Sequence, residues 1–363
     1  MSEFIGFGLG IRRRRNKNTL DVLYPKIIFD QEQKLLAQLT EELSIDQKGF
    51  YTLSQEQVFN LLEKLEDLEV SPSVAEHFKL FSNEVASPSS YSRSDLGLFV
   101  LDDTSSKTES IEEAYFKLQC LSQLHVKPHG INLDGIFGIL NNIAWSNKGP
   151  ILVEDLGFET TRAAVLGENL QVTHVDKFPY MINYHIPNGV RVVSGSQVRL
   201  GAHLAPGTTV MPAGYVNFNA GTLGNAMVEG RISAGVVVGA DTDLGGGASI
   251  MGTLSGGNNH VISIGEKCLL GANAGTGISL GNGCTIAAGV YVTAAAKVWL
   301  YNTNKTAVNL EGEEVSEGEN IVKGSDLSGK DNLLFILDST NGHLVCRPNT
   351  KMIELNESLH QND

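Results

Sequence analysis

An aliphatic residue recurs at every sixth position along one stretch of this chain, and this repeat limits the possible folds more than any other feature. The series runs through Ile186, Val192, Val198, Leu204, Val210 and Val216, changes phase, and resumes at Ile232, Val238, Leu244 and Ile250. It continues through Ile262, Cys268, Ala274, Leu280, Ile286, Val292 and Val298. A period of six matches neither the helical period nor strand alternation. It is typical of a parallel β-helix, in which each hexapeptide forms one side of a triangular coil and neighbouring coils bury one another.

Composition agrees with a narrow triangular coil. The chain has 39 glycines, concentrated between residues 195 and 289, and only 7% aromatic residues. Small residues fill the tight corners of such a coil, and large rings do not fit inside it. We expect about six coils, which at the spacing of neighbouring strands form a prism about 30 Å long. The predicted fold is a parallel β-helix, expected to be left-handed as hexapeptide prisms are, although the repeat itself does not fix the hand.

Charge and cysteine content restrict the class of protein. The formal net charge of −14 argues against non-specific nucleic-acid binding, which needs a basic surface. Four cysteines show no CxxC spacing and are expected to be reduced thiols: Cys120, Cys268, Cys284 and Cys346. We find neither a secretory-signal pattern nor an apolar run long enough to cross a bilayer, so the predicted location is the cytoplasm.

The remaining chain divides into three further segments. Residues 1–150 are predicted to be a mainly helical domain, because apolar residues recur at helical spacing in 31–44, 54–70 and 109–125. Ser54 and Gln57 form a capping-box pattern, Pro72 closes that helix, and 88–92 is a linker. Residues 151–185 are expected to be a mixed α/β connecting segment that covers the first coil. The β-helix domain occupies 186–300, and 301–363 is a C-terminal segment with a β-hairpin turning at Asn341-Gly342.

Charged residues interrupt the small, apolar composition of the coils at few positions. Glu229 and Arg231 lie two residues apart, where the repeat changes phase. Neighbours at i and i+2 on a strand point to the same side, so this acid and base are expected to share one surface. A surface ion pair is the structural interpretation. The functional one is a carboxylate that accepts a proton or attacks an acyl carbonyl, beside an arginine that holds an anion.

Glycine-rich stretches provide a second candidate feature. We expect Gly245–Gly247 and 255–260 to interrupt the repeat, with the second bulging outward as a loop while the repeat keeps its phase on either side. Such a loop is either a simple turn or a backbone that approaches a phosphate or pantetheine arm. Because the prism interior is filled with aliphatic side chains, sites lie on its outside. A homotrimer with active sites between subunits follows from this. The basic run Arg12–Arg15 is expected to be solvated.

Two long blocks carry a family resemblance. They are VRLGAHLAPGTTVMPAGYVNFNAGTLGNAMVEGRISAGVVVGADTDLGGGASIMGTLSGG and ISIGEKCLLGANAGTGISLG. The chain closely resembles the tetrahydrodipicolinate N-succinyltransferases of the longer bacterial type over about 187–298, and more weakly to its C-terminus. The resemblance implies transfer of succinyl from succinyl-CoA to the amino group of ring-opened tetrahydrodipicolinate, in lysine and diaminopimelate biosynthesis, by a trimeric left-handed β-helix enzyme.

The resemblance also implies site residues. Glu229 matches the catalytic carboxylate, for which a transient acyl anhydride has been proposed. Positions that match contacts to the CoA thioester are Arg231, Gly246, Ser249, Ala272, Ala287, Ala288, Ala295 and Lys323. Small residues let the pantetheine arm lie flat, and Arg and Lys meet phosphates. We add Arg199 as a candidate anchor for a substrate carboxylate.

Two departures from the family pattern affect these expectations. Some relatives hold a divalent ion on the three-fold axis with two acidic residues, whereas Ser196 and Ala213 occupy those positions here. We therefore predict no metal on that axis. Relatives can also carry a basic pair after NLLF, where this chain has Ile336-Leu337. The residues that hold the CoA phosphates are left open.

Two alternatives to the succinyltransferase remain. One is another hexapeptide acyltransferase, such as the tetrahydrodipicolinate N-acetyltransferase or an enzyme using His203 or His260 as its base. The other is a zinc-binding or purely structural prism, and zinc would need three imidazoles at matched heights. The role of Glu229, as general base or as nucleophile, also stays open.

Overall fold

The structure is a computed structural model that describes residues 4–29, 33–54, 56–57, 60, 91–255 and 260–350. The chain separates into two compact units. The N-terminal unit takes its described residues from Met1–Val126, Gly130–Pro179 and Asn183–His185, and the coil unit from Lys127–His129, Tyr180–Ile182 and Ile186–Asp363. The connecting segment 151–185 therefore falls almost entirely within the N-terminal unit.

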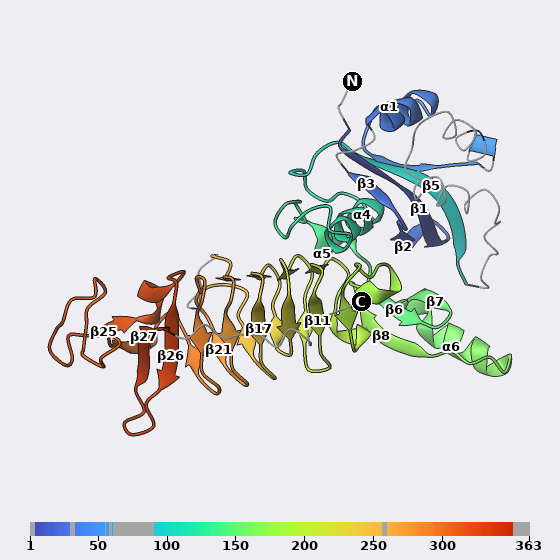
Figure 1. Cartoon of the computed structure of the whole chain (residues 1–363). Helices are drawn as coiled ribbons and strands as arrows, with labels where there is room; N and C mark the ends of the chain where they lie inside the picture. The colour runs from blue at the N-terminus through green and yellow to red at the C-terminus, as the bar shows by residue number, and fades with distance from the viewer. Residues whose placement is uncertain are drawn as a thin grey trace. The chain divides into compact units, whose positions relative to one another are not determined.

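The N-terminal unit is built on a five-stranded antiparallel sheet, so the prediction of a mainly helical domain is wrong for its described part (Figure 1). Its strands are β1 Gly6–Arg15, β2 Asn18–Leu23, β3 Ile27–Phe29, β4 Gly49–Thr52 and β5 Arg93–Leu101. β1 carries glycine where a strand usually carries a core side chain. Tyr24 fills the space above Gly10, where a Cβ would lie 2.6 Å from its ring, and Phe116 lies over Gly8. Phe7, Leu9 and Ile11 therefore alternate with glycines rather than with polar residues, so β1 lacks the apolar/polar alternation of a half-buried strand.

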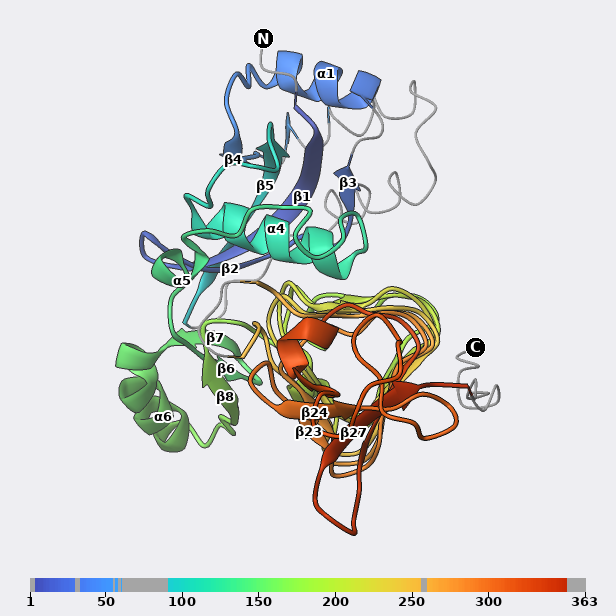
Figure 2. The same ribbon diagram turned by 90° about the vertical axis from the view of Figure 1, so that its left-hand side faces the viewer.

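Helices form at two of the predicted segments. α1 spans Gln33–Glu42 and α4 spans Ile111–Ser122, which is capped by the Ser110 side chain. α4 lies across the sheet (Figure 2). The predicted capping box is present, with Ser54 N donating to Gln57 Oε1 (2.9 Å) and Gln57 N to Ser54 Oγ (3.2 Å). Most of the predicted helix 54–70, Pro72 and most of the predicted linker lie outside the described residues. Within the part of the chain that is described, no helix is long and apolar enough to span a bilayer.

The basic run is paired, and the expectation that it is solvated is wrong. Arg12 bonds Asp95 (2.6 Å) and Glu112 (2.9 Å). Arg13 pairs with the fully buried Asp21 through its Nε (2.8 Å). Burial alone would lower the pKa of Arg13, but the Asp21 carboxylate outweighs it and raises that pKa. The arginines therefore join β1 to its neighbours, which composition alone does not reveal.

A smaller antiparallel sheet completes the N-terminal unit. Its order is β7-β6-β8, from strands Gly149–Leu152, Ile143–Ser146 and Val172–Asp176. The short helix α5, Ile136–Ile139, precedes this sheet, and α6, Leu156–Val165, lies between β7 and β8. This agrees with the mixed α/β composition expected for the segment.

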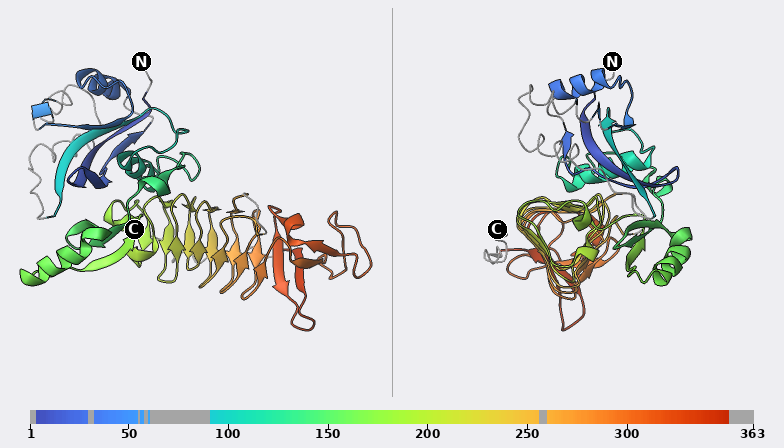
Figure 3. Two further views of the ribbon diagram at one scale, coloured as in Figure 1. Left: turned by 180° about the vertical axis from the view of Figure 1, so that it is seen from behind. Right: turned by 90° about the vertical axis from the view of Figure 1, so that its right-hand side faces the viewer.

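The coil unit is a parallel β-helix with a triangular cross-section (Figures 2 and 3). We name its sides by their strands. The first face contains β9 Arg191–Val192, β11 Thr208–Val210, β14 Ala226–Val228, β17 Thr242–Leu244, β20 Leu269–Leu270 and β22 Thr285–Ile286. The second face contains β12 Tyr215–Val216, β15 Arg231–Ile232, β18 Ser249–Ile250, β21 Gly275–Thr276 and β23 Tyr291–Val292. The third face contains β10 His203–Leu204, β13 Gly221–Thr222, β16 Val237–Val238 and β19 Ser263–Ile264.

The predicted repeat is largely the observed core. Val198, Leu204, Val210 and Val216 are fully buried, as are Ile232 and Val238. Ile186, by contrast, is 52% exposed, so the buried series starts later than predicted. Thr222 and Val228 occupy inward positions that were not included in the predicted series.

The six-residue repeat was predicted to change phase near Glu229 and to keep its phase across the stretch 255–260. The structure agrees with the first prediction and differs from the second. The first phase change lies at Glu229–Arg231, because Val228 ends a first-face strand and Ile232 already lies on the second face. Across 255–260, Val238 pairs with Ile264, so the inward strand position is two residues beyond Ile262 and the phase is not kept. In the same way, the inward strand positions that were predicted at Cys268 and Ala274 are occupied by Leu270 and Thr276, two residues further along. All three predicted residues are nevertheless buried, since each side has two inward positions two residues apart, and hydropathy alone does not distinguish them.

The C-terminal hairpin is confirmed. β26 Leu333–Leu337 pairs antiparallel with β27 Leu344–Pro348, and the turn between them contains Gly342 at φ 76°. β26 also pairs in parallel with β22, so the hairpin continues the first face beyond the last hexapeptide strand. It covers what would otherwise be an open sheet edge. β24 Lys297–Leu300 and β25 Ile321–Lys323 join the same sheet.

Candidate functional site

The edge between the first and second faces aligns several predicted site residues. Main-chain bonds join successive coils along this edge: Gly247 N to Glu229 O (3.1 Å), Asn273 N to Gly246 O (2.9 Å) and Gly289 N to Ala272 O (2.9 Å). Neighbouring coils are about 4.8 Å apart. Glu229, Gly246, Ala272 and the Ala287-Ala288 pair are therefore stacked in one row along the outside of the prism.

Glu229 begins this row of small residues as a half-buried carboxylate. Its Oε2 lies 3.6 Å from the position that a Cβ on Gly246 would occupy. The carboxylate thus lies over the glycine of the next coil. Gly245–Gly247 form an ordinary corner between β17 and β18, so the expectation that they interrupt the repeat is wrong.

Arg231 projects from the adjacent second face and is exposed. Its Nη2 donates to Ser249 Oγ (2.7 Å), and the two residues are directly paired between β15 and β18. Glu229 precedes the turn and Arg231 follows it, so they do not share one strand, as the i, i+2 argument assumed. Arg231 bonds Ser249 rather than forming the surface ion pair considered for these two residues.

The other predicted CoA contacts fall into two groups. Ala272 and Ala288 are exposed on the edge, with Ala287 half-buried beside them. Ala295 lies beyond the second face, after β23, and Lys323 ends β25. The structure thus brings Glu229, Arg231, Gly246 and Ser249 together, with the alanines further along the prism and Lys323 at its far end.

Arg199 lies two coils before Arg231 on the second face. Its N donates to Val216 O (3.1 Å) and its Nη1 to Asn217 Oδ1 (3.2 Å). On the coil between them, Tyr215 pairs directly with Arg231, whereas Arg199 is in line with Asn217. Arg199 and Arg231 therefore belong to one outer face and bond different partners there.

Sequence reasoning missed Tyr291, an exposed aromatic residue on the same face. It pairs with Gly275, and a Cβ on Gly275 would lie 2.1 Å from the Tyr291 ring. The ring therefore covers Gly275, in line with Arg231 and Ser249. Its sequence signal was an aromatic residue directly before the inward Val292, in a chain where aromatic residues are rare.

The two histidines considered as a catalytic base or as zinc ligands lie in different surroundings, and the two positions considered for a metal on the trimer axis are exposed. His203 is 6% exposed in β10, whereas His260 is exposed and directly follows residues that lie outside the described part of the chain. Thr253 and Val261 form an antiparallel bridge, and most of the predicted outward loop lies outside the described residues. Ser196 and Ala213 are both exposed. Among the described residues, no three His, Cys, Asp or Glu side chains cluster as metal ligands.

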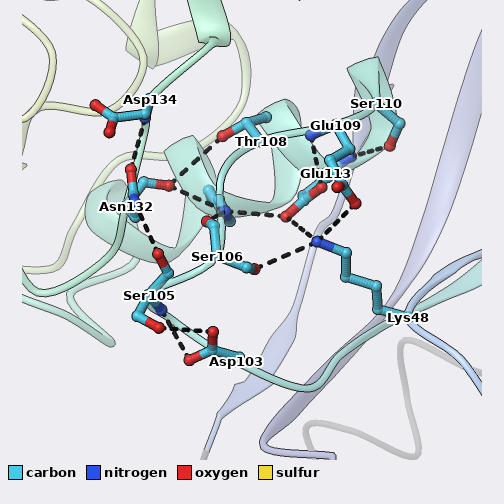
Figure 4. Close-up of polar contacts among 11 residues, drawn as sticks. Lys48, Asp103, Ser105, Ser106, Thr108, Glu109, Ser110, Glu113, Asn132 and Asp134 are labelled. Carbon is cyan, nitrogen blue, oxygen red and sulfur yellow. Dashed lines mark hydrogen bonds and ion pairs between the residues drawn. The ribbon is translucent and has the colours of Figure 1, made fainter.

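A polar cavity of about 270 Å³ lies in the N-terminal unit. Its walls include Lys48 and Glu113, and Figure 4 shows how these side chains meet beside Glu109 and Ser106. Lys48 Nζ contacts Glu109 (3.0 Å) and Glu113 (3.3 Å), and the buried Lys117 contacts Glu113 (2.9 Å). Since these charges already pair with one another, the network stabilises the packing of α4.

Comparisons with known proteins agree with this geometry. The model of the hexapeptide repeat of succinyl-transferase matches residues 261–294, and that of the tetrahydrodipicolinate N-succinyltransferase middle segment matches 140–180. A Vibrio cholerae protein is 43% identical over 362 residues, which cover 98% of this chain and 99% of that protein. A Pseudomonas aeruginosa protein is 41% identical, with 98% and 97% covered. Both are named 2,3,4,5-tetrahydropyridine-2,6-dicarboxylate N-succinyltransferase.

A solved structure extends the likeness to the fold. It is a Campylobacter jejuni protein described as a candidate 2,3,4,5-tetrahydropyridine-2-carboxylate N-succinyltransferase, with a TM-score of 0.85 and 32% identity, covering 98% of this chain and 94% of that one. The stacked hexapeptide coils, with an acid and an arginine at one edge, define a hexapeptide-repeat acyltransferase. The chain belongs to the 2,3,4,5-tetrahydropyridine-2,6-dicarboxylate N-succinyltransferase family. This family fits a left-handed coil.

Proposed function

We propose that this protein transfers the succinyl group of succinyl-CoA to the amino group of ring-opened 2,3,4,5-tetrahydropyridine-2,6-dicarboxylate. The products are N-succinyl-2-amino-6-oxopimelate and CoA, in the route to diaminopimelate and lysine. The observation that carries this proposal is the arrangement of Glu229 over Gly246, with the Arg231–Ser249 contact on the adjoining face. Family membership over nearly the whole chain supports it.

Glu229 is the catalytic carboxylate in this proposal. As a general base, it takes the proton of the attacking amine while the C–N bond forms and the thioester C–S bond breaks. As a nucleophile, it forms an acyl anhydride and releases CoA thiolate. The amine then attacks the succinyl carbonyl of the anhydride, the C–O bond to Glu229 breaks to regenerate its carboxylate, and the amine proton passes to the thiolate. In both versions backbone N–H groups stabilise the oxyanion. Its half-exposed position over a glycine leaves room for a thioester beside the carboxylate.

The CoA thioester extends along the outside of the prism from this point. Arg231 and Ser249 bind near the thioester, and the row of small residues gives a flat path for the pantetheine arm. That path uses Gly246, Ala272, Ala287, Ala288 and Ala295, with Lys323 at the far end. Four of these positions, Gly246, Ala272, Ala287 and Ala288, share the edge that begins at Glu229, which supports the direction of the path.

The site is completed by a second copy of the chain. Every element of the path lies on the outer surface, because the interior is filled with aliphatic side chains. A homotrimer with the active sites between subunits supplies the second wall. Arg199, on the same face as Arg231, binds a carboxylate of the acceptor.

We expect no metal ion on the trimer axis, because Ser196 and Ala213 offer no carboxylate. Succinyl-CoA is the only cosubstrate proposed. All four cysteines are buried and unbridged, which supports a reducing compartment such as the cytoplasm.

The test compares acyl donors. Free CoA is followed with a thiol reagent, using succinyl-CoA or acetyl-CoA and the acceptor or its acyclic analogue 2-aminopimelate. Acceptor-dependent release with succinyl-CoA is the expected result. A preference for acetyl-CoA would instead indicate a tetrahydrodipicolinate N-acetyltransferase, and no release with either donor would contradict both.

A further inference from the structure

Two lysines face each other at the far end of the coil unit. Lys297 opens β24, Lys323 closes β25, and the antiparallel register pairs them directly. Side chains of directly opposed residues leave the same face of a sheet. Both lysines are exposed, while Val298 beside Lys297 is fully buried, so both lysine side chains leave the sheet on its outward face.

Like charges in this position destabilise a strand pair unless an anion neutralises them. Among the described residues, no carboxylate lies within ion-pair distance of either ammonium group. Asp326, three residues after Lys323, bonds locally: its Oδ2 accepts from Lys323 N (3.0 Å) and its Oδ1 from Ser325 Oγ (3.3 Å). The lysine pair is therefore a concentration of positive charge in a chain whose net charge is −14.

The backbone holds this pair beside the proposed path of the thioester. Gly324 N donates to Ala296 O and Ser325 N to Ala294 O, both at 2.9 Å. The approach is so close that a Cβ on Gly324 would lie 2.2 Å from Thr293 O. Lys323 is thereby fixed against the segment that contains Ala295.

A flat aromatic surface adjoins the two lysines. Trp299 follows Lys297 by two residues on the outward side of β24, about 6.8 Å along the strand. Its ring is stacked on His343, with centroids 3.9 Å apart and an interplanar angle of 11°. Adjacent cations and a ring stack are the features that bind a nucleotide, through its phosphates and its base.

We propose that Lys297 and Lys323 together bind the phosphate groups at the nucleotide end of the CoA thioester. This inference rests on the proposed function and adds Lys297 to the residues that the family resemblance implies. The pair supplies two donors to one anionic group, in a chain that lacks a basic pair after NLLF.

The experiment measures CoA binding by calorimetry, and steady-state kinetics with succinyl-CoA and with S-succinylpantetheine, which lacks the nucleotide. Lys297→Ala is expected to weaken CoA binding about tenfold and to raise KM for succinyl-CoA similarly at unchanged kcat. KM for S-succinylpantetheine stays at the wild-type value. Lys297→Arg retains most of the affinity, and Lys330→Ala, which removes another exposed lysine of this unit, has no effect.

The outcomes separate the two proposals. Equal losses with both donors, or unchanged CoA affinity in Lys297→Ala, would overturn the phosphate site while leaving the reaction intact. A wild-type protein that binds CoA through Lys297 but transfers no succinyl group would overturn the proposed function alone. Wild-type protein that does not bind CoA would overturn both the proposed function and the phosphate site. Binding of 3′-dephospho-CoA identifies which phosphate Lys297 contacts. If wild type and Lys297→Ala bind it equally, Lys297 contacts the 3′-phosphate. If Lys297→Ala still binds it more weakly than wild type, Lys297 contacts the diphosphate.

Discussion

Arg231 and Ser249 are directly paired on neighbouring coils, and Arg231 Nη2 donates to Ser249 Oγ at 2.7 Å. This contact orients the guanidinium on the outer face, at the end of the path where the thioester is proposed to bind. The arginine is exposed and has a long flexible side chain, so a single hydrogen bond contributes measurably to its orientation.

Ser249→Ala is therefore expected to raise KM for succinyl-CoA about fivefold, because the arginine loses a partner worth about 1 kcal/mol. The fold should be unaffected. Ser263→Ala, the same change at an exposed third-face position, serves as the control and should leave KM unchanged. Equal KM values for wild type and Ser249→Ala in steady-state assays would contradict a role for this contact.

Two glycines of the coil unit should respond differently to an added methyl group. A Cβ on Gly221 would lie 1.8 Å from His203 O, and its φ is 151°. Gly221→Ala is expected to cost about 3 kcal/mol or more in the free energy of unfolding, since backbone cannot yield to the clash. At Gly246 the same Cβ meets only Glu229 Oε2 at 3.6 Å, so Gly246→Ala should fold normally. Denaturant unfolding checks both, and comparable stability of the two variants would contradict the close approach.

The buried ion pair of the N-terminal unit offers a third test. Lys117 is fully buried, and its Nζ contacts Glu113 Oε1 (2.9 Å), Ser106 O (2.7 Å) and Asn132 O (2.9 Å). Lys117→Met leaves Glu113 buried with a weaker set of partners, and we expect a loss of about 3 kcal/mol. Adding Glu113→Gln should recover part of it. A double variant that loses the sum of the single effects would indicate that the two side chains are not coupled.

His125 makes the N-terminal unit sensitive to acid. Burial, followed by the Lys26 charge, lowers the pKa of His125 to about 4 from an ordinary value of 6.5. Between these values the unfolded chain binds a proton that the folded chain does not, so stability falls as the pH drops from about 6.5 to about 4. His185 changes in the same direction, also through burial.

The expected contribution of His125 is about 2 kcal/mol over this range. Urea unfolding at pH 7 and pH 4.5 measures it, with His125→Gln as the comparison. The variant should lose less stability than wild type on acidification. Identical pH dependence in the two proteins would contradict the lowered pKa.

The hexapeptide repeat could be predicted from sequence because each side of a coil buries small or aliphatic side chains, which therefore recur at a spacing of six residues. Its register could not, because Cys268 and Leu270 are both buried and differ only in which one lies on the strand. Hydropathy is the same for either choice. Only the pairing with Leu244 distinguishes them.

The N-terminal sheet was missed for a related reason. In β1 the apolar side chains alternate with glycines, and the side chains that cover Gly8 and Gly10 belong to Phe116 and Tyr24, which lie outside the strand. The usual apolar/polar alternation of a strand is therefore missing from β1. At the candidate site, Glu229 and Arg231 could be selected because they interrupt the repeat. Tyr291 and Lys297 could not, because their significance depends on Gly275 and Lys323 across neighbouring strands.

The most direct test of the proposed function is acceptor-dependent CoA release from succinyl-CoA by Glu229→Gln. This change keeps the size of the side chain but removes its ability to accept a proton or an acyl group. We expect kcat to fall by about a thousandfold with thermal stability retained. Glu266→Gln, at an exposed position of another coil edge, should match wild type. A Glu229→Gln protein that releases CoA at the wild-type rate would contradict the account.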